Sequence, residues 1–397
     1  MLPMSPSLSR LHFVRATPAV AAIVFLGGCA GLRPLPRGAT PTCSPKDISV
    51  DSLWACLPAV PREARESGFK STSRVAQGDM RRKNGDQRQP SSCLGSPPPG
   101  FSRVDVEAQH LPTGRAPLHA LFHEPEVGRP IVIAVHGLFD SKFSRYVTLT
   151  ASALAHEGFG VLVPDMRWHG CLLTREWLPT LGIEESKDLV AWSSWLRAAH
   201  PGHEVGLLGF SLGGLDVLEA GGLTDSLEAF GAGVVAISPP AALRRTTAFL
   251  DAPSFVADRG LTVLIKRLFR VYLSARLQTL GIERANPPRF HDLVGWVAKE
   301  GPFPKPLTAD ELLALAEPDR SLSGARRPVL ILATLNDPVF SEAAVAALAE
   351  AARANPYVRV LETPGGGHLG QIGLYPSWFR ETIVTFFTHS STVAPRN

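Results

Sequence analysis

The chain has almost no excess of charge of either sign and few charged residues altogether. Its 397 residues include 40 lysines and arginines and 36 aspartates and glutamates, so the formal net charge is +4, and charged residues make up 19%. A nucleic-acid-binding surface would require a marked basic excess, so this class of protein is not favoured. With 45% hydrophobic residues, the chain is also too apolar to be wholly disordered or a coiled coil.

The common metal and nucleotide motifs are missing as well. There are five cysteines, and no two of them have the two-residue spacing of a zinc knuckle. Neither the metalloprotease pattern nor the phosphate-binding loop occurs. Glycines at 365, 367 and 370 match a dinucleotide fingerprint in form, but too few residues follow for the rest of such a domain. We therefore expect no metal and no organic cofactor.

The N-terminal apolar run, residues 19–26, is far shorter than the roughly 18 residues that span a bilayer. Arg10 and Arg15 precede it without any acidic residue, and two glycines follow it before Cys29. This order of segments is typical of an export signal. The small residues before Cys29 resemble the lipobox of bacterial lipoproteins, which implies removal of residues 1–28 and lipidation of Cys29. A plain signal peptide cut elsewhere is the alternative.

The lipobox resemblance implies an exported protein of the cell envelope, anchored to a membrane by its lipid and facing the periplasm. Residues 29–100 are rich in proline and have little hydrophobic periodicity, so they are predicted to form a tether. An exported compartment permits disulfides, and four cysteines remain after cleavage. The sequence does not distinguish their three possible pairings. These cysteines are Cys43, Cys56, Cys93 and Cys171.

The globular part is predicted over residues 101–390, with a short tail over 391–397. Seven short apolar runs in this part are predicted strands. From the second run onward they are continuously apolar rather than alternating, which is typical of a parallel sheet covered on both faces. The runs are residues 118–122, 131–135, 161–163, 205–208, 234–237, 329–332 and 358–361.

Helical patterns alternate with these runs, for example at residues 184–200 and 341–354. The alternation predicts an α/β protein with a mostly parallel, doubly wound sheet. A long stretch without a strand follows residue 237, and we predict a helical cap insertion there, over about 240–318. It includes an amphipathic pattern at 261–280, for which contact with a membrane surface is the alternative to packing over the site.

Residues 209–213 read Gly-Phe-Ser-Leu-Gly, directly after a predicted strand and before a helical pattern. A serine at the apex of such a strand-to-helix turn has a strained backbone, and small residues two positions away on either side avoid clashes. The turn lifts the hydroxyl clear of the sheet, beside a helix N-terminus that favours negative charge. Ser211 is therefore the candidate nucleophile.

A serine nucleophile needs a base, and the base needs an orienting acid. Asp337 and His368 each follow the end of a predicted strand. Such carboxyl ends form the crevice in which open α/β sheets bind their ligands. We therefore predict a catalytic triad of Ser211, Asp337 and His368, with Asp319 and Glu362 as alternative acids.

These motifs together resemble the α/β-hydrolase superfamily, in which the triad has the chain order serine, acid, histidine. The resemblance covers residues 131–378. Four segments within it are similar to the YheT-like branch of esterases, which implies hydrolysis of carboxylic esters, often with lipid-like acyl groups. That branch carries an acidic residue and a glycine after His-Gly-Leu, whereas this chain has Phe139 and Asp140. The entrance that this loop forms is therefore predicted to fit a substrate different from those of the YheT-like branch. The four segments are residues 136–138, 165–170, 336–338 and 366–370.

The same resemblance implies where the oxyanion hole lies. In an α/β-hydrolase the amide after the nucleophile, here Leu212, acts together with an amide of the loop after an earlier strand, here Leu138. His136 in that loop is predicted to pack the loop rather than act as a second base. His169 is predicted to shape the pocket wall, with substrate contact as the lesser alternative.

The sequence thus predicts a lipid-anchored serine hydrolase that cleaves small-molecule or lipid esters through an acyl-enzyme. An acyltransferase with the same triad is one alternative, because an alcohol or amine can replace water in the second step. A non-catalytic envelope lipoprotein that binds an apolar ligand beneath the cap is the other alternative.

Overall fold

The computed structural model describes residues 49–62, 95–108, 116–172, 177–223, 226–252 and 289–395, with six helical residues between 266 and 277. The predicted signal peptide and Cys29 lie outside the described residues, as do Cys43 and Cys93. Cys56 and Cys171 are both disulfide-bonded. Within the described part of the chain, no helix combines the length and apolar character needed to cross a bilayer.

Eight strands form one mixed sheet in the order β1-β2-β4-β3-β5-β6-β7-β8. β2 is antiparallel to both β1 and β4, and all other neighbours are parallel. The prediction of an α/β protein with a mostly parallel sheet is confirmed. The strands are β1 Ser102–Ala108, β2 Ala116–His123, β3 Ile131–Val135, β4 Gly160–Pro164, β5 Val205–Phe210, β6 Val234–Ile237, β7 Val329–Thr334 and β8 Val358–Thr363.

All seven predicted strands are present, as β2 to β8. Every residue of β3 to β7 is buried, which explains their continuously apolar sequences. β1, at the edge of the sheet, is missing from the prediction. Its sequence alternates, with Arg103 and Asp105 exposed while Val104 and Val106 pack against the core.

Two helical layers enclose the sheet. Apolar side chains of α5, α6, α12 and α13 pack against one face, and those of α2, α4 and α15 pack against the other. The predicted helices at 184–200 and 341–354 are confirmed as α5 and α13. The helices are α2 Val50–Cys56, α4 Arg145–Ala155, α5 Glu185–Ala199, α6 Leu212–Gly222, α7 Ser226–Ala229, α8 Leu243–Asp251, α10 Phe290–Glu300, α11 Ala309–Leu315, α12 Asp319–Gly324, α13 Glu342–Arg353, α14 Gln371–Leu374 and α15 Pro376–His389, with 3₁₀ turns η1 Gly170–Leu172 and η2 Ser390–Thr392.

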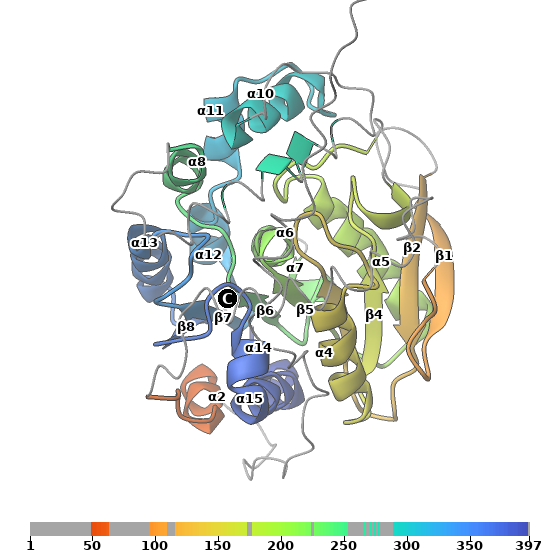
Figure 1. The fold of residues 1–397 in the computed structure, drawn as a ribbon. Coiled ribbons are helices and arrows are strands. Elements are labelled where there is room, and N and C mark those ends of the chain that lie inside the picture. Colours follow the sequence, from red (N-terminus) through yellow and green to blue (C-terminus); the bar gives the residue numbers. More distant parts are fainter. Residues whose placement is uncertain are drawn as a thin grey trace, which may run out of the picture.

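Between β6 and β7, helices α8, α10 and α11 leave these two layers and lie together at the top of Figure 1. They form a third apolar cluster with Leu273 and Leu277, which belong to the region of the predicted helix at 261–280. Trp168 and Leu212 from the body of the molecule are part of the same cluster. Because these two residues follow β4 and β5, the helices cover the carboxyl edge of the sheet.

Part of the segment predicted as a tether, residues 29–100, is folded against the body. Leu53 of α2 is completely buried. The indole N–H of Trp54 donates to the carbonyl oxygen of Pro356 over 3.0 Å, and α2 lies beside α15 at the lower edge of Figure 1. Residues 49–62 are therefore not a tether. They contain the short amphipathic helix α2, which the sequence analysis did not predict because the surrounding sequence is rich in proline.

Candidate active site

Ser211 occupies the turn between β5 and α6, where its φ is 54° and its ψ is −119°. This left-handed backbone is strained for a residue with a side chain. The flanking glycines are required by close contacts. A Cβ at Gly209 would lie 2.0 Å from the carbonyl oxygen of Gly213, and a Cβ at Gly213 would lie 2.4 Å from that of His136. The motif Gly-Phe-Ser-Leu-Gly thus forms the sharp turn that its glycines predict.

Two hydrogen bonds connect Ser211, His368 and Asp337. His368 Nε2 lies 2.9 Å from Ser211 Oγ, and His368 Nδ1 lies 2.9 Å from Asp337 Oδ2. An ionised carboxylate only accepts hydrogen bonds, so Nδ1 carries the proton and Nε2 accepts from the serine hydroxyl. This arrangement can move the serine proton to an imidazole while a buried carboxylate fixes the tautomer.

The acid and the base are both shielded from water. The side chain of Asp337 is 2% exposed and that of His368 is 13% exposed. The ring of Phe340 packs edge-on against the imidazole, with ring centroids 5.1 Å apart. The alternative acids of the sequence analysis, Asp319 and Glu362, are exposed instead. The structure therefore pairs His368 with the acid that the sequence favoured.

The loop that carries His368 is attached to the end of β7 by two hydrogen bonds. The Thr334 hydroxyl donates to the carbonyl oxygen of Gly367 over 2.8 Å, and the Gly367 amide donates to Asn336 Oδ1 over 2.9 Å. Gly367 has a φ of 56°, which glycine adopts without strain. Sequence reasoning did not assign a role to Thr334 or Asn336, although Asn336 stands next to Asp337.

Ser211 and His368 line a cavity of about 200 Å³. Its other walls come from residues 137–140, α6, α8, α10 and α11, and they are mostly apolar. Leu138 and Leu212, whose amides the family resemblance assigns to an oxyanion hole, both line this cavity. A smaller apolar cavity against α10 shares these two leucines. Such walls suit an apolar group held next to the serine hydroxyl.

The loop after β3 passes directly beside the nucleophile turn. A Cβ at Gly137 would lie 3.2 Å from the Cβ of Ser211 and 3.3 Å from the carbonyl oxygen of Phe210. Glycine therefore lets this backbone come close to the serine. Two residues further on, Phe139 has a φ of 68°.

Both histidines of the neighbouring loops are buried and hydrogen-bonded to the backbone. His136 Nδ1 donates to the carbonyl oxygen of Gly137 over 2.9 Å, and its Nε2 accepts the Met166 amide over 3.2 Å. Burial lowers the pKa of His136 below its ordinary value, so it stays neutral in this loop-packing position. His169 is 2% exposed and is not among the residues that line the cavity.

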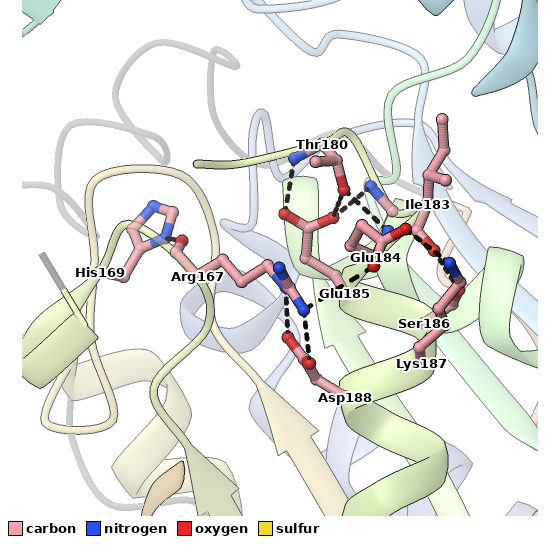
Figure 2. A network of polar contacts seen from close by, with 10 residues as sticks. Arg167, His169, Thr180, Ile183, Glu184, Glu185, Ser186, Lys187 and Asp188 are labelled. Atoms are coloured by element: carbon pink, nitrogen blue, oxygen red, sulfur yellow. Dashed lines mark hydrogen bonds and ion pairs between the residues drawn. The ribbon is translucent and has the colours of Figure 1, made fainter. Parts of the chain in front are cut away.

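A cluster of carboxyl groups that the sequence did not predict includes Asp188 on α5 and Asp216 and Glu219 on α6. Figure 2 shows Arg167 bound through two hydrogen bonds to Asp188, at 2.6 and 2.9 Å, near the α5 carboxylates. Burial raises the pKa of Glu219 on α6 to about 7, and burial among neighbouring carboxylates raises the pKa of Asp216 well above its ordinary value. Among the described residues, no group of three or more His, Cys, Asp or Glu is placed to hold a metal ion.

A sequence model of the alpha/beta hydrolase family matches residues 132–378. No match to a curated protein was found. The Pyrococcus furiosus esterase Pf2001 is similar in structure, with a TM-score of 0.53 and 19% identity over 75% of this chain and 97% of the esterase. The Pyrococcus horikoshii acylaminoacyl peptidase has a TM-score of 0.50 and 15% identity over 75% of this chain and 43% of the peptidase.

A third solved structure, the 2,6-dihydroxy-pseudo-oxynicotine hydrolase, has a TM-score of 0.50 and 18% identity over 81% of this chain and 77% of that hydrolase. At these identities the likenesses show the fold. The fold predicted from the sequence is therefore confirmed both by the sheet order and by these structures.

Proposed function

The chain belongs to the alpha/beta hydrolase family, and on this premise we propose that it is a serine hydrolase that cleaves carboxylic esters. Ser211, His368 and Asp337 form its catalytic triad. The observation that carries the proposal is the pair of 2.9 Å hydrogen bonds through these residues, at the wall of an apolar cavity.

In the first half of the reaction, Ser211 Oγ attacks the ester carbonyl carbon while His368 Nε2 takes the hydroxyl proton. Asp337 stabilises the imidazolium that forms. The tetrahedral intermediate then expels the alkoxide, which takes the proton from His368 and leaves as the alcohol. Water attacks the acyl-enzyme by the same route, which releases the acid and restores the serine.

The amides of Leu138 and Leu212 supply the oxyanion hole. Both residues line the cavity beside Ser211. The amides on either side of Leu138 already donate to side chains, whereas those of Leu138 and Leu212 have no acceptor among the described residues. Leu212 is also the first residue of α6, where the helix dipole favours negative charge. Two donors of this kind stabilise a developing oxyanion strongly in a site that excludes water.

The apolar walls favour an acyl group without charge, since a charged group would lose its hydration there. We therefore propose a lipid-like acyl chain, in agreement with the similarity to the YheT-like esterases. This acyl chain would enter the cavity between the loop of residues 137–140 and the cap helices α8, α10 and α11.

Labelling with a fluorophosphonate probe tests the proposal, because the probe reacts with serine only when the hydroxyl is activated. We expect labelling of the wild type, none of Ser211→Ala and much slower labelling of His368→Ala. A correctly folded wild type that does not react would contradict the proposal and favour the ligand-binding alternative. Product analysis with added alcohols or amines then separates hydrolysis, which releases free acid, from acyl transfer.

We also propose that Cys29 carries a lipid that anchors the protein to a membrane of the cell envelope, facing the periplasm. The support is the order of basic, apolar and small residues before this cysteine. Cys29→Ser should move the protein from the membrane to the soluble fraction. Unchanged membrane association of this variant would contradict the anchor.

A further inference from the structure

Phe139 is held in an unfavourable backbone conformation beside the nucleophile. Its φ of 68° lies in the left-handed region, which a bulky side chain rarely adopts. Such a conformation persists only where the surrounding structure fixes it. Because Phe139 directly follows Leu138, whatever fixes its backbone also sets the direction of the peptide that precedes it.

His169 provides one such contact. Its Nδ1 lies 2.5 Å from the carbonyl oxygen of Arg167, and a carbonyl only accepts, so Nδ1 carries the proton. The lone pair of Nε2 is then available, and the Phe139 amide donates to it over 3.0 Å. The ring is 2% exposed and packs against His136, with ring centroids 4.9 Å apart. His169 is thus a backbone acceptor rather than a wall of the cavity.

Arg167 fixes the position of this imidazole. Its carbonyl oxygen accepts from His169, while its guanidinium forms two hydrogen bonds with Asp188 on α5. Figure 2 shows these two contacts on opposite sides of Arg167, with the His169 ring on one side and the carboxylates of α5 on the other. The Arg167 carbonyl therefore sets the tautomer of His169, and the buried ion pair holds the residue that carries this carbonyl.

Tyr146 on α4 holds the other side of Leu138. The Gly137 amide donates to the Tyr146 hydroxyl oxygen over 2.8 Å, and that hydroxyl donates to Asp140 Oδ2 over 2.8 Å. The two amides that flank Leu138 are therefore both engaged away from the cavity.

We propose that His169 is a positioning residue for the oxyanion hole, and that it acts together with Tyr146 by holding the amides on both sides of Leu138. The inference rests on the proposed function, because it assigns a task to the Leu138 amide in ester hydrolysis. With its neighbours fixed, the Leu138 amide is directed toward the intermediate before the substrate arrives, so no reorganisation is needed during the reaction.

The test uses two near-isosteric variants of the full-length protein, His169→Gln and His169→Met. Gln keeps an acceptor for the Phe139 amide and Met does not. On a p-nitrophenyl ester, we expect His169→Met to lower kcat by ~10- to 100-fold, because a misplaced oxyanion donor weakens transition-state binding. KM should change less than about twofold, since the cavity wall is intact, and His169→Gln should recover most of kcat. His389→Met, which replaces a buried histidine of α15 outside the cavity, is the matched control and should behave as wild type.

Hydrogen exchange of the amides at residues 137–140 gives a readout that does not depend on activity. We expect faster exchange in His169→Met than in wild type, and near-normal exchange in His169→Gln. Unchanged exchange in His169→Met, or equal loss of kcat in both variants, would overturn the inference. A wild type without turnover or probe labelling would contradict the proposed function instead, whatever the exchange rates show.

Discussion

The carboxyl groups of Asp337 and of Asp216 and Glu219 on α6 are all largely shielded from water, but they differ in their hydrogen-bond partners. Asp337 Oδ2 faces His368, and its Oδ1 accepts the Val339 amide over 2.8 Å. In contrast, Asp216 Oδ1 and Glu219 Oε1 have no hydrogen-bond partner among the described residues. Asp337 thus has a donor on each of its carboxylate oxygens, whereas Asp216 lies near the carboxyl groups of Glu185, Asp188 and Glu219.

This difference decides what each carboxyl group can do. Donors around a buried carboxylate compensate for its lost hydration, and a carboxylate held in this way can stabilise an imidazolium. Burial raises the pKa of Asp216 well above its ordinary value, and it raises the pKa of Glu219 to about 7 even though Glu219 keeps a hydrogen bond with Ser321. From this comparison we propose that Asp337 acts in the chemistry, and we expect Asp216 and Glu219 to make the stability of the fold depend on pH.

Asp337→Asn should have the largest effect and should act on turnover alone. The amide cannot stabilise the imidazolium and favours the wrong tautomer, so we expect kcat to fall by roughly 10³- to 10⁴-fold, as for comparable triads. The midpoint of thermal unfolding should change little. Asp319→Asn, which alters an exposed acid of α12, is the control and should be fully active. Full activity of Asp337→Asn would mean that another acid orients His368.

Arg167→Met should have the next largest effect and should act on stability. The substitution leaves Asp188 buried without its bidentate partner, so the free energy of unfolding should fall by about 3–5 kcal/mol. Urea denaturation at pH 8 measures this loss. The double variant Arg167→Met/Asp188→Leu removes the unpaired charge and should recover most of the stability. A single variant as stable as wild type would show that this ion pair does not stabilise the body.

The parts of this molecule that the sequence predicts are those governed by local rules. Strands buried on both faces are continuously apolar, and β3 and β6 have the bounds that their apolar runs predict. The nucleophile turn needs glycines at fixed positions, so the presence of Gly209 and Gly213 in the sequence predicts it. Asp337 and His368 follow strand ends, and the parallel sheet brings those ends to one edge.

The parts that the sequence does not predict depend on packing between distant segments. Glu184, Glu185 and Asp188 look like the acidic first turn of a solvated helix, which the helix dipole favours. Their burial results from the position of α5 against the loop that carries Arg167. Likewise, nothing in the sequence near Tyr146 indicates that its hydroxyl accepts the Gly137 amide, because that contact requires α4 to pack beside the loop.

Glu219 allows the sign of the pH dependence to be worked out. Its pKa is about 7 in the folded protein and 4.5 in the absence of burial. Between these values the folded state keeps a proton that the unfolded state releases, so the free energy of unfolding falls as the pH rises. The stabilising contribution is complete below pH 4.5 and is lost by the time the pH exceeds about 7.

Glu219→Gln should remove this pH dependence of the unfolding free energy. Its effect should be smaller than those of Asp337→Asn and Arg167→Met. Glutamine has the shape of the protonated acid and can keep the hydrogen bond with Ser321, but it releases no proton in the unfolded state. The fall in unfolding free energy between pH 5 and pH 8 should therefore shrink by roughly 1–3 kcal/mol. Glu350→Gln, on the exposed face of α13, is the matched control and should leave the fall unchanged. An equal fall in wild type and Glu219→Gln would mean that Glu219 ionises in the fold as easily as in the unfolded chain, and the contrast with Asp337 would then rest on Asp216 alone.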